Sequence, residues 1–251
     1  MHRPIPPASR FAASRFTLSV LLLAALLPAV AVSGEPRSES KVFGGLTASA
    51  GREYGDLAAV NGGIRIERDA RVRSAETVNG GILVEEGAEV GRAETVNGGI
   101  RIAGRVRLGS AETVNGGIHL DAGSHATGKL RTVNGGIRIG TGSRVDGNVA
   151  TINGGIRLEG AEVHGLLRTV NGDLRLERGS RAGGIEVEAA NRGWWSWGGE
   201  KLPTVVVGPE AEVRGPMVFR REVRLYVHAS ARIGEVRGAT VRRFEGEQPP
   251  E

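Results

Sequence analysis

Apolar residues recur at every sixth position through the middle of the chain, with glycines and polar residues between them. The series consists of Val60, Ile66, Val72, Val78, Val84, Val90, Val96, Ile102, Leu108, Val114 and Leu120. Apolar and polar residues also alternate locally as in a strand, since Ile64 and Ile66 flank Arg65. The pattern predicts an all-β fold in which each six-residue unit is one short strand and its turn.

A longer repeat, Thr-Val-Asn-Gly-Gly-Ile, groups these units in threes. It occurs at residues 77–82, 95–100, 113–118 and 132–137, with variants at 59–64, 151–156 and 169–174. Its asparagines are 18 or 19 residues apart, so three six-residue sides make one coil. Repeats this short stack into solenoids, and we expect a single-stranded, three-sided parallel β-helix of roughly ten coils. Because Asn and Gly tolerate left-handed backbone, the Asn-Gly-Gly corner is expected to have positive φ.

The repeat divides the chain into segments. Regular coils are predicted over residues 42–190, and degenerate coils over 204–243, where Val207, Val213, Phe219 and Leu225 resume the spacing of six. Between them lies a tryptophan-rich insertion at 191–203, and a polar tail follows at 244–251. Residues 34–41 are predicted to be a linker. Phe43 stands where later coils have Asn, and we expect it to close the open end of the core.

The first 33 residues resemble a secretory signal peptide. Three arginines precede the apolar run Phe16 to Leu27, and Pro28 and small residues follow it. The run is shorter than the ~20 residues of a comfortable membrane span, which favours cleavage over an uncleaved anchor. The leader predicts export, to the periplasm, the cell surface or the medium.

The spaced Asn-Gly-Gly-Ile coils and the coil from Val205 to Ile233 resemble those of secreted bacterial β-solenoid proteins of the adhesin type. They also resemble bactofilins, polymer-forming bacterial proteins with a short three-sided β-helix. The resemblance covers residues 42 to 240 and implies a right-handed helix, whereas the six-residue period alone suits either hand. The leader and the tryptophan-rich insertion depart from the bactofilin pattern. A repeat pattern of this kind indicates the fold more strongly than the function.

Composition narrows the possible roles. Forty glycines fit a fold of many sharp turns, and the absence of cysteine excludes disulfides, thiolate metal sites and lipoprotein anchoring. The formal net charge is +5, but three arginines lie in the leader, which leaves 30 basic against 28 acidic residues. A net charge of +2 gives little attraction for nucleic acid, and no nucleic-acid partner is expected.

Several columns of like residues follow from stacking the coils. An asparagine column is expected to form a structural hydrogen-bonded ladder: Asn61, Asn79, Asn97, Asn115, Asn134, Asn153 and Asn171. Arginines after that corner could bind a polyanion, although acidic residues two positions on could neutralise them: Arg65, Arg101, Arg138, Arg157 and Arg175.

Two further columns, one of glutamates and one of threonines, contain polar residues that could be buried or exposed. Glu76, Glu94 and Glu112 stack at a position that simple alternation would bury, and three buried carboxylates would be costly. We therefore expect them to be exposed at a corner, with the alternation broken there. The threonines that follow them form a single rank, and ice-binding solenoids use paired ranks.

The strongest binding candidates are Trp194, Trp195 and Trp197, because exposed tryptophans stack on sugars and anchor protein interfaces. The alternative is that they cover part of the core. The histidines show no metal-ligand spacing, and no catalytic residue, metal or cofactor is predicted. We expect a non-enzymatic structural or adhesive scaffold. It would act through self-association of its end coils, as in bactofilin filaments, or through a lateral glycan or protein partner; a glycan-active or acyl-transferring enzyme is the less favoured alternative.

Overall fold

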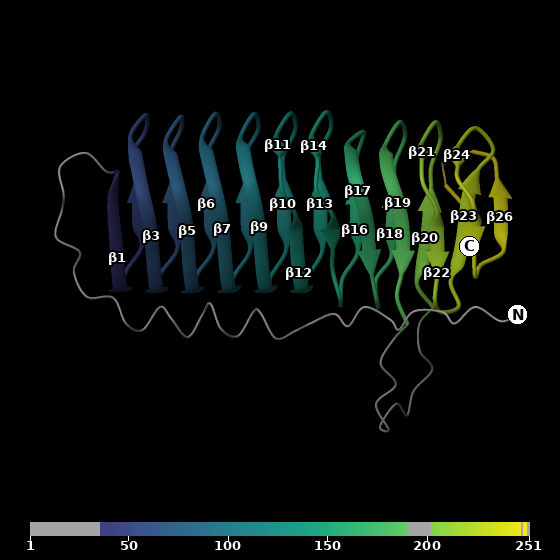
Figure 1. Cartoon of the computed structure of the whole chain (residues 1–251), viewed down its shortest axis with the longest axis horizontal. Coiled ribbons are helices and arrows are strands. Elements are labelled where there is room, and N and C mark those ends of the chain that lie inside the picture. Colours follow the sequence, from purple (N-terminus) through teal and green to yellow (C-terminus); the bar gives the residue numbers. More distant parts are fainter. Residues whose placement is uncertain (1–35, 190–201, 247, 250–251) are drawn as a thin grey trace, which may run out of the picture. The chain divides into compact units, whose positions relative to one another are not determined.

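The computed structural model describes residues 36–189, 202–246 and 248–249, and every regular element in them is a strand. Residues 34–251 form one compact unit. Its strands stack side by side as two parallel sheets (Figure 1). Sheet B has eleven strands: β2 (Leu46–Ala48), β4 (Ile64–Ile66), β6 (Ile82–Val84), β8 (Ile100–Ile102), β10 (Ile118–Leu120), β13 (Ile137–Ile139), β16 (Ile156–Leu158), β18 (Leu174–Leu176), β20 (Thr204–Val207), β23 (Arg224–His228) and β26 (Val241–Phe244).

Sheet A holds the remaining 15 strands. They are β1 (Arg37–Phe43), β3 (Glu53–Asn61), β5 (Arg71–Asn79), β7 (Glu89–Asn97), β9 (Arg107–Asn115), β11 (His125–Ala126), β12 (Leu130–Asn134), β14 (Arg144–Val145), β15 (Val149–Ala150), β17 (Glu162–Thr169), β19 (Arg181–Val187), β21 (Glu212–Val213), β22 (Met217–Phe219), β24 (Arg232–Ile233) and β25 (Val236–Arg237). A coil thus alternates between the sheets, and the predicted parallel β-solenoid is confirmed, with about eleven coils of about 18 residues.

The long strands of sheet A cover two sides of the coil. Strand β9 pairs with β11 through Arg107 and Leu108 and with β12 through residues 111–115. Each coil in this region therefore contributes three strand segments, one to sheet B and two to sheet A. Like residues stack in register, so a column on the surface comprises one residue from each successive coil.

The core is a stack of small and branched apolar side chains. In one coil these are Ile64, Ile66, Ala70, Val72 and Ala75, each no more than 4% exposed. Similar sets repeat in the other coils and form one continuous core. Because a single coil cannot cover its own edges, this core becomes dry only when neighbours stack on it.

One column of the six-residue pattern is not in the core. Val78 and its equivalents Val60, Val96 and Val114 are half-buried, whereas the preceding Thr77 is buried. The Thr77 hydroxyl donates to the carbonyl oxygen of Gly62 at 2.8 Å, and the bond recurs in later coils. The predicted inward position of these valines is therefore wrong, because a threonine whose hydroxyl is bonded can occupy the core. The threonine rank is an internal feature and presents no surface array.

Most left-handed residues lie at a different corner from the predicted one. Positive φ occurs mainly between a sheet B strand and the next sheet A strand, for example at Gly87 (75°), Gly123 (71°) and even Asp69 (58°). The exceptions are in the end coils, where Gly44 (88°) and Gly238 (83°) lie between a sheet A strand and the next sheet B strand. The glycines of the Asn-Gly-Gly corner have no left-handed φ. The first of them is required by close approach instead: a Cβ on Gly98 would lie 2.1 Å from the carbonyl oxygen of the preceding coil.

The asparagine column forms the predicted ladder. Each Nδ2 donates to Oδ1 of the preceding asparagine at 2.8–3.0 Å, from Asn79 through to Asn171. At the far end, Arg221 Nη1 donates to Asn171 Oδ1 at 2.7 Å and caps the column. The ladder is exposed, so each bond contributes on the order of 1 kcal/mol.

Asn115→Ala should lower the free energy of unfolding by about 1–2 kcal/mol, because Asn115 donates to Asn97 and accepts from Asn134. Thermal unfolding followed by circular dichroism measures this. Asn148→Ala, which removes one hydrogen bond from the Leu166 N–H outside the ladder, gives the comparison and should cost less than the loss of two ladder bonds. An Asn115→Ala protein as stable as the wild type would show that the ladder does not stabilise the stack.

At both ends of the solenoid the structure differs from what the sequence predicted. Residues 37–41 of the predicted linker belong to strand β1, which pairs with β3. Phe43 does not close the core, since it is 79% exposed at the head of the asparagine column, opposite Asn61. Phe244, assigned to the polar tail, belongs to β26 and is buried. The predicted signal peptide at 1–33 lies outside the described residues.

Candidate functional site

The arginine column follows the middle of sheet B. Arg101, His119, Arg138, Arg157 and Arg175 stack in register across β8, β10, β13, β16 and β18. Four arginines of this column pair with a carboxylate of the next coil, whereas Arg175 lies 4.0 Å from Glu177 of its own coil. The pairs are Arg65 with Glu85 (2.7 Å), Arg101 with Asp121 (3.6 Å), Arg138 with Glu159 (3.5 Å) and Arg157 with Glu177 (3.3 Å). This geometry favours the self-neutralised surface over a free polyanion site.

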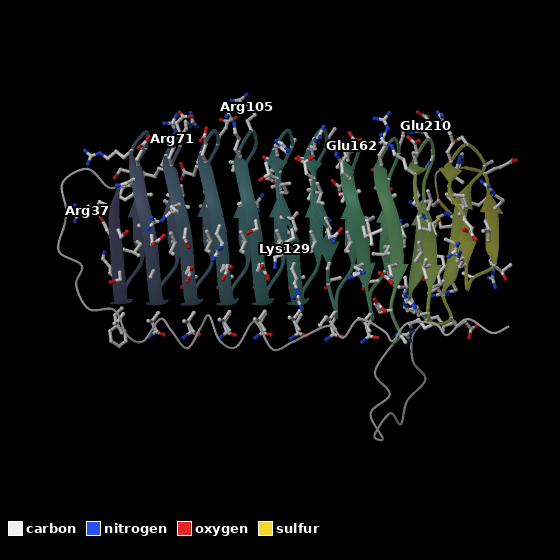
Figure 2. The ribbon with its side chains drawn as sticks, viewed as in Figure 1. Arg37, Arg71, Arg105, Lys129, Glu162 and Glu210 are labelled. Carbon is white, nitrogen blue, oxygen red and sulfur yellow. The ribbon has the colours of Figure 1, made fainter. Side chains whose placement is uncertain are left out.

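A second charged column, which the sequence reading did not identify, alternates in sign along sheet A, and its member Arg71 is labelled in Figure 2. Glu53, Arg71, Glu89 and Arg107 stack in register, and Arg71 bonds Glu53 at 2.8 Å. Glu89 lies 3.7 Å from Arg71 and 3.4 Å from Arg107. Aligning the coils at this position would have revealed the alternation. Opposite charges in a strand ladder attract across the coils and leave little net charge.

The column continues into a histidine-containing network. His125 Nε2 lies 2.7 Å from Asp146 Oδ2, and Arg144 Nε donates to Asp146 Oδ1 at 2.7 Å. Hydrogen bonds from Arg144 and His125 lower the pKa of Asp146. His164 reaches both Asp146 and Glu162. In the described part of the chain no group of three or more His, Asp or Glu residues is arranged to hold a metal ion.

The glutamate column differs from its prediction. Glu76, Glu94 and Glu112 lie within β5, β7 and β9 instead of at a corner, and they are half-buried. The alternation is broken just before Glu76, because Ser74 and Ala75 are both buried. Glu112 bonds Lys129 at 2.7 Å, while Glu94 lies 3.6 Å from Arg92. Burial raises the pKa of Glu94, and the carboxylates of Glu76 and Glu112 raise it further.

Glu94→Gln should stabilise the protein by about 0.5–1 kcal/mol at pH 7, because it removes a repelled carboxylate. The pKa of Glu94 is raised in the folded state, so its ionisation costs stability as the pH rises through that value. At about pH 3, where the carboxyl is largely protonated in both states, the difference should vanish. Urea unfolding at the two pH values measures it, with Glu85→Gln on sheet B as the control. An equal gain at both pH values would contradict this electrostatic explanation.

A tight ionic cluster marks the base of the insertion. Glu186 is 8% exposed, and Arg168 Nε donates to its Oε2 at 2.8 Å while Arg220 Nη2 donates to its Oε1 at 3.0 Å. Burial alone would raise the pKa of Glu186, but these hydrogen bonds bring it below the usual value. Arg220 also pairs with Glu188, the last carboxylate before the insertion. The cluster ties together strands β17, β19 and the turn after β22.

The insertion falls, in the sequence, between β19 and β20. Val187 ends β19 in register with Thr169, and Val205 of β20 is in register with Leu174. Thr169 and Leu174 lie on either side of the Asn171-Gly172-Asp173 corner of the preceding coil. Trp194, Trp195 and Trp197 fall in this segment and lie outside the described residues. Their predicted binding role stays a prediction.

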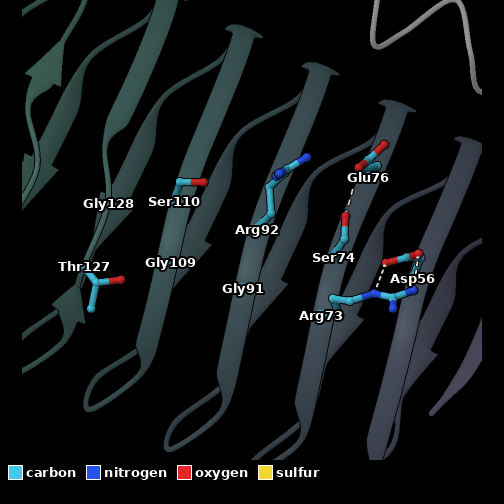
Figure 3. A pocket seen from close by; sticks show the side chains of 10 residues that line it. All are labelled: Asp56, Arg73, Ser74, Glu76, Gly91, Arg92, Gly109, Ser110, Thr127 and Gly128. Atoms are coloured by element: carbon cyan, nitrogen blue, oxygen red, sulfur yellow. Dashed lines mark hydrogen bonds and ion pairs between the residues drawn. The ribbon is translucent and has the colours of Figure 1, made fainter. Parts of the chain in front are cut away.

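A cleft lies where the two sheet A segments of a coil meet. It has a volume of about 640 Å³ and crosses five coils (Figure 3). Its lining comprises Asp56, Arg73, Ser74, Glu76, Gly91, Arg92, Gly109, Ser110, Thr127 and Gly128. An adjoining cleft of about 420 Å³ shares Arg73, Gly91, Gly109 and Thr127 and continues towards Arg71 and Arg107.

Glycines form the floor of this cleft because the backbone leaves no room for side chains. A Cβ on Gly91 would lie 2.4 Å from the carbonyl oxygen of Arg73, and one on Gly109 would lie 2.0 Å from that of Gly91. The hollow therefore follows from the packing of consecutive coils. At one end it is closed by Arg73, which donates to both oxygens of Asp56.

No protein-family model, curated protein or solved structure matches the chain. The resemblance to adhesin-type solenoids and bactofilins thus stays a prediction. Within the residues that the structure describes, no helix has the length and apolar character needed to cross a bilayer.

Proposed function

We propose that the protein is an exported, non-enzymatic scaffold that works as a single solenoid and binds partners along its sides. The observation that carries this proposal is the charge built into both end coils. A solenoid that grows by end-to-end stacking must bring two open cores together, and charged inward positions oppose such contact.

The first coil holds these charges on β1. Arg37, Glu39 and Lys41 pair in register with Tyr54, Leu57 and Ala59, which are buried core residues of the next coil. The three charged residues thus occupy the inward register. Arg37 lies 3.1 Å from Glu39, and Lys41 donates to the carbonyl oxygen of Gly45. Stacking another copy here would desolvate these charges against an apolar core.

The last coil also carries a charged residue in the inward register. Val241 and Arg243 of β26 are in register with the buried Leu225 and Val227 of β23. Arg243 is exposed and donates to the carbonyl oxygen of His228 at 3.2 Å. Isolated edge strands otherwise recruit further strands, so this arrangement supports a lateral role over a filament.

Without end-to-end growth, the solenoid can still act as a rigid support that presents a binding segment at its side. The ionic cluster around Glu186 ties β19, the strand before the insertion, to β17 and to the turn after β22. Trp194, Trp195 and Trp197 follow β19 in the sequence, in a segment that interrupts the repeat. A cell-surface glycan or protein is the kind of partner that such tryptophans favour.

Sedimentation velocity across protein concentration and salt tests the proposal. We expect a single species of monomer mass. A variant with Arg37→Val, Glu39→Val and Lys41→Val should associate end to end, because it restores an apolar edge. A control with Arg65→Val, Arg101→Val and Arg138→Val, which removes three charges from sheet B, should stay monomeric. Wild-type filaments that persist at high salt would replace this proposal with the bactofilin-like alternative.

A further inference from the structure

Three polar side chains face the glycine-floored cleft without a short hydrogen bond of their own. The Ser110 hydroxyl has no hydrogen-bond partner among the described residues, and the Thr127 hydroxyl has only a long contact of 3.5 Å to the Leu108 carbonyl. Arg92 is 58% exposed and lies 3.6 Å from its nearest carboxylate, that of Glu94. By contrast, Asp56 and Arg73 bond each other, as do Ser74 and Glu76. The three are therefore the cleft's available donors and acceptors.

These three groups come from three successive coils. Arg92 and Ser110 are in register on β7 and β9, and Thr127 directly follows Ala126, which pairs with Leu108. In a parallel stack like positions are spaced by about 4.8 Å along the axis. The cleft thus offers one polar contact per coil over a floor of bare backbone at Gly91, Gly109 and Gly128, with Thr127 one residue out of register with Arg92 and Ser110 (Figure 3).

The chemistry of the cleft selects among elongated ligands. Its volume falls within the range of about 300–1,000 Å³ typical of small-ligand sites. The strands that border it are paired on both sides, so a peptide could not add to them as a further strand. The lining carries two carboxylates, Asp56 and Glu76, and two guanidinium groups, Arg73 and Arg92, so its charges cancel and give a polyanion no net attraction. Hydroxyl groups, in contrast, can accept from Arg92 and can both donate to and accept from the hydroxyls of Ser110 and Thr127.

We propose that the cleft binds a linear glycan without acidic groups, lying along the solenoid axis with successive sugar units at Arg92, Ser110 and Thr127. A pyranose unit advances a linear chain by a length comparable to the rise of one coil, so the contacts can repeat without distortion. This inference rests on the proposed lateral binding role and assigns it a site separate from the tryptophan-rich insertion.

Isothermal titration of the full chain with three oligosaccharide probes tests the site. The probes are cello-oligosaccharide, which is neutral, chitosan oligomer, which carries amines, and oligogalacturonate, which is acidic. We expect the neutral or the amine-bearing probe to bind and the acidic probe not to bind. Arg92→Ala should then weaken binding about tenfold, the effect of losing one hydrogen bond from a charged donor.

Arg101→Ala is the matched control. Arg101 is 63% exposed and lies 3.6 Å from Asp121, close to the 58% and 3.6 Å of Arg92 beside Glu94, but it lies on sheet B. It should leave affinity unchanged. Ser110→Phe, which fills the cleft, should abolish binding while thermal unfolding shows that the protein is folded. Binding by none of the probes, by the acidic probe alone, or equally by the Arg92→Ala protein would overturn the site. A monomer in sedimentation would still support the scaffold role.

Discussion

Gly98→Ala is expected to destabilise the solenoid by about 3 kcal/mol or more, although it adds a single methyl group. The added Cβ would lie 2.1 Å from the carbonyl oxygen of Gly80 and 2.5 Å from its carbonyl carbon. Both atoms belong to the backbone of the preceding coil, so no side-chain rotation can relieve the contact. The two coils would have to separate, which breaks the hydrogen bonds of the sheets on either side of the corner.

The neighbouring glycine supplies the control. A Cβ on Gly99 would lie 3.3 Å from the carbonyl oxygen of Gly117, so Gly99→Ala should cost less than about 1 kcal/mol. The chain itself carries a side chain at this position in one coil, where Asp173 replaces the second glycine. Urea unfolding of the two variants measures the contrast. Equal destabilisation would show that backbone freedom, and not close approach, is what both glycines provide.

The solenoid could be predicted because the same spacing of apolar residues recurs in every coil. A deviation in one repeat does not change the period of the others. The sequence mispredicted which residue of Thr77-Val78 is buried because hydrophobicity alone favours valine, whereas the carbonyl of Gly62 satisfies the buried hydroxyl. It also placed left-handed residues at the wrong corner. Asparagine and glycine are compatible with positive φ, but here the ladder and the close contact between coils explain them.

Surface features could be predicted from the sequence only where they arise from the stacking of like residues in successive coils. The arginine column and its carboxylate partners come from aligned repeats. The cleft could not be predicted, since it depends on a bend within the coil and on missing side chains at Gly91, Gly109 and Gly128. The edge strand was missed for another reason. Arg37, Glu39 and Lys41 lack the apolar alternation of a strand because an edge protected by charge has no apolar partner to face.

Arg168→Leu should lower the free energy of unfolding by about 3 kcal/mol, because breaking a buried ion pair leaves a poorly compensated charge. Glu186 would keep Arg220 but lose the two hydrogen bonds that Arg168 donates to Oε2. Arg65→Leu breaks a pair of similar length on the exposed face of sheet B and should cost less than about 1 kcal/mol. Thermal and urea unfolding of both variants give the comparison, and equal losses would show that burial of Glu186 does not matter.

The pH dependence of the Arg168→Leu effect separates charge from packing. Because the pKa of Glu186 is lowered in the folded protein, its stabilising contribution is present above the unfolded value of about 4.3 and is lost as the pH falls through the folded value. In the variant, the pKa of Glu186 should rise, since burial is opposed by one arginine instead of two. The stability difference between wild type and variant should therefore be larger at pH 7 than at about pH 3, where the carboxyl is largely protonated in the variant. A difference independent of pH would assign the effect to the packing of the arginine side chain over β17 and β19. Strand β19 would then be held in place by side-chain packing, and the charges of the Glu186 cluster would contribute little to stability.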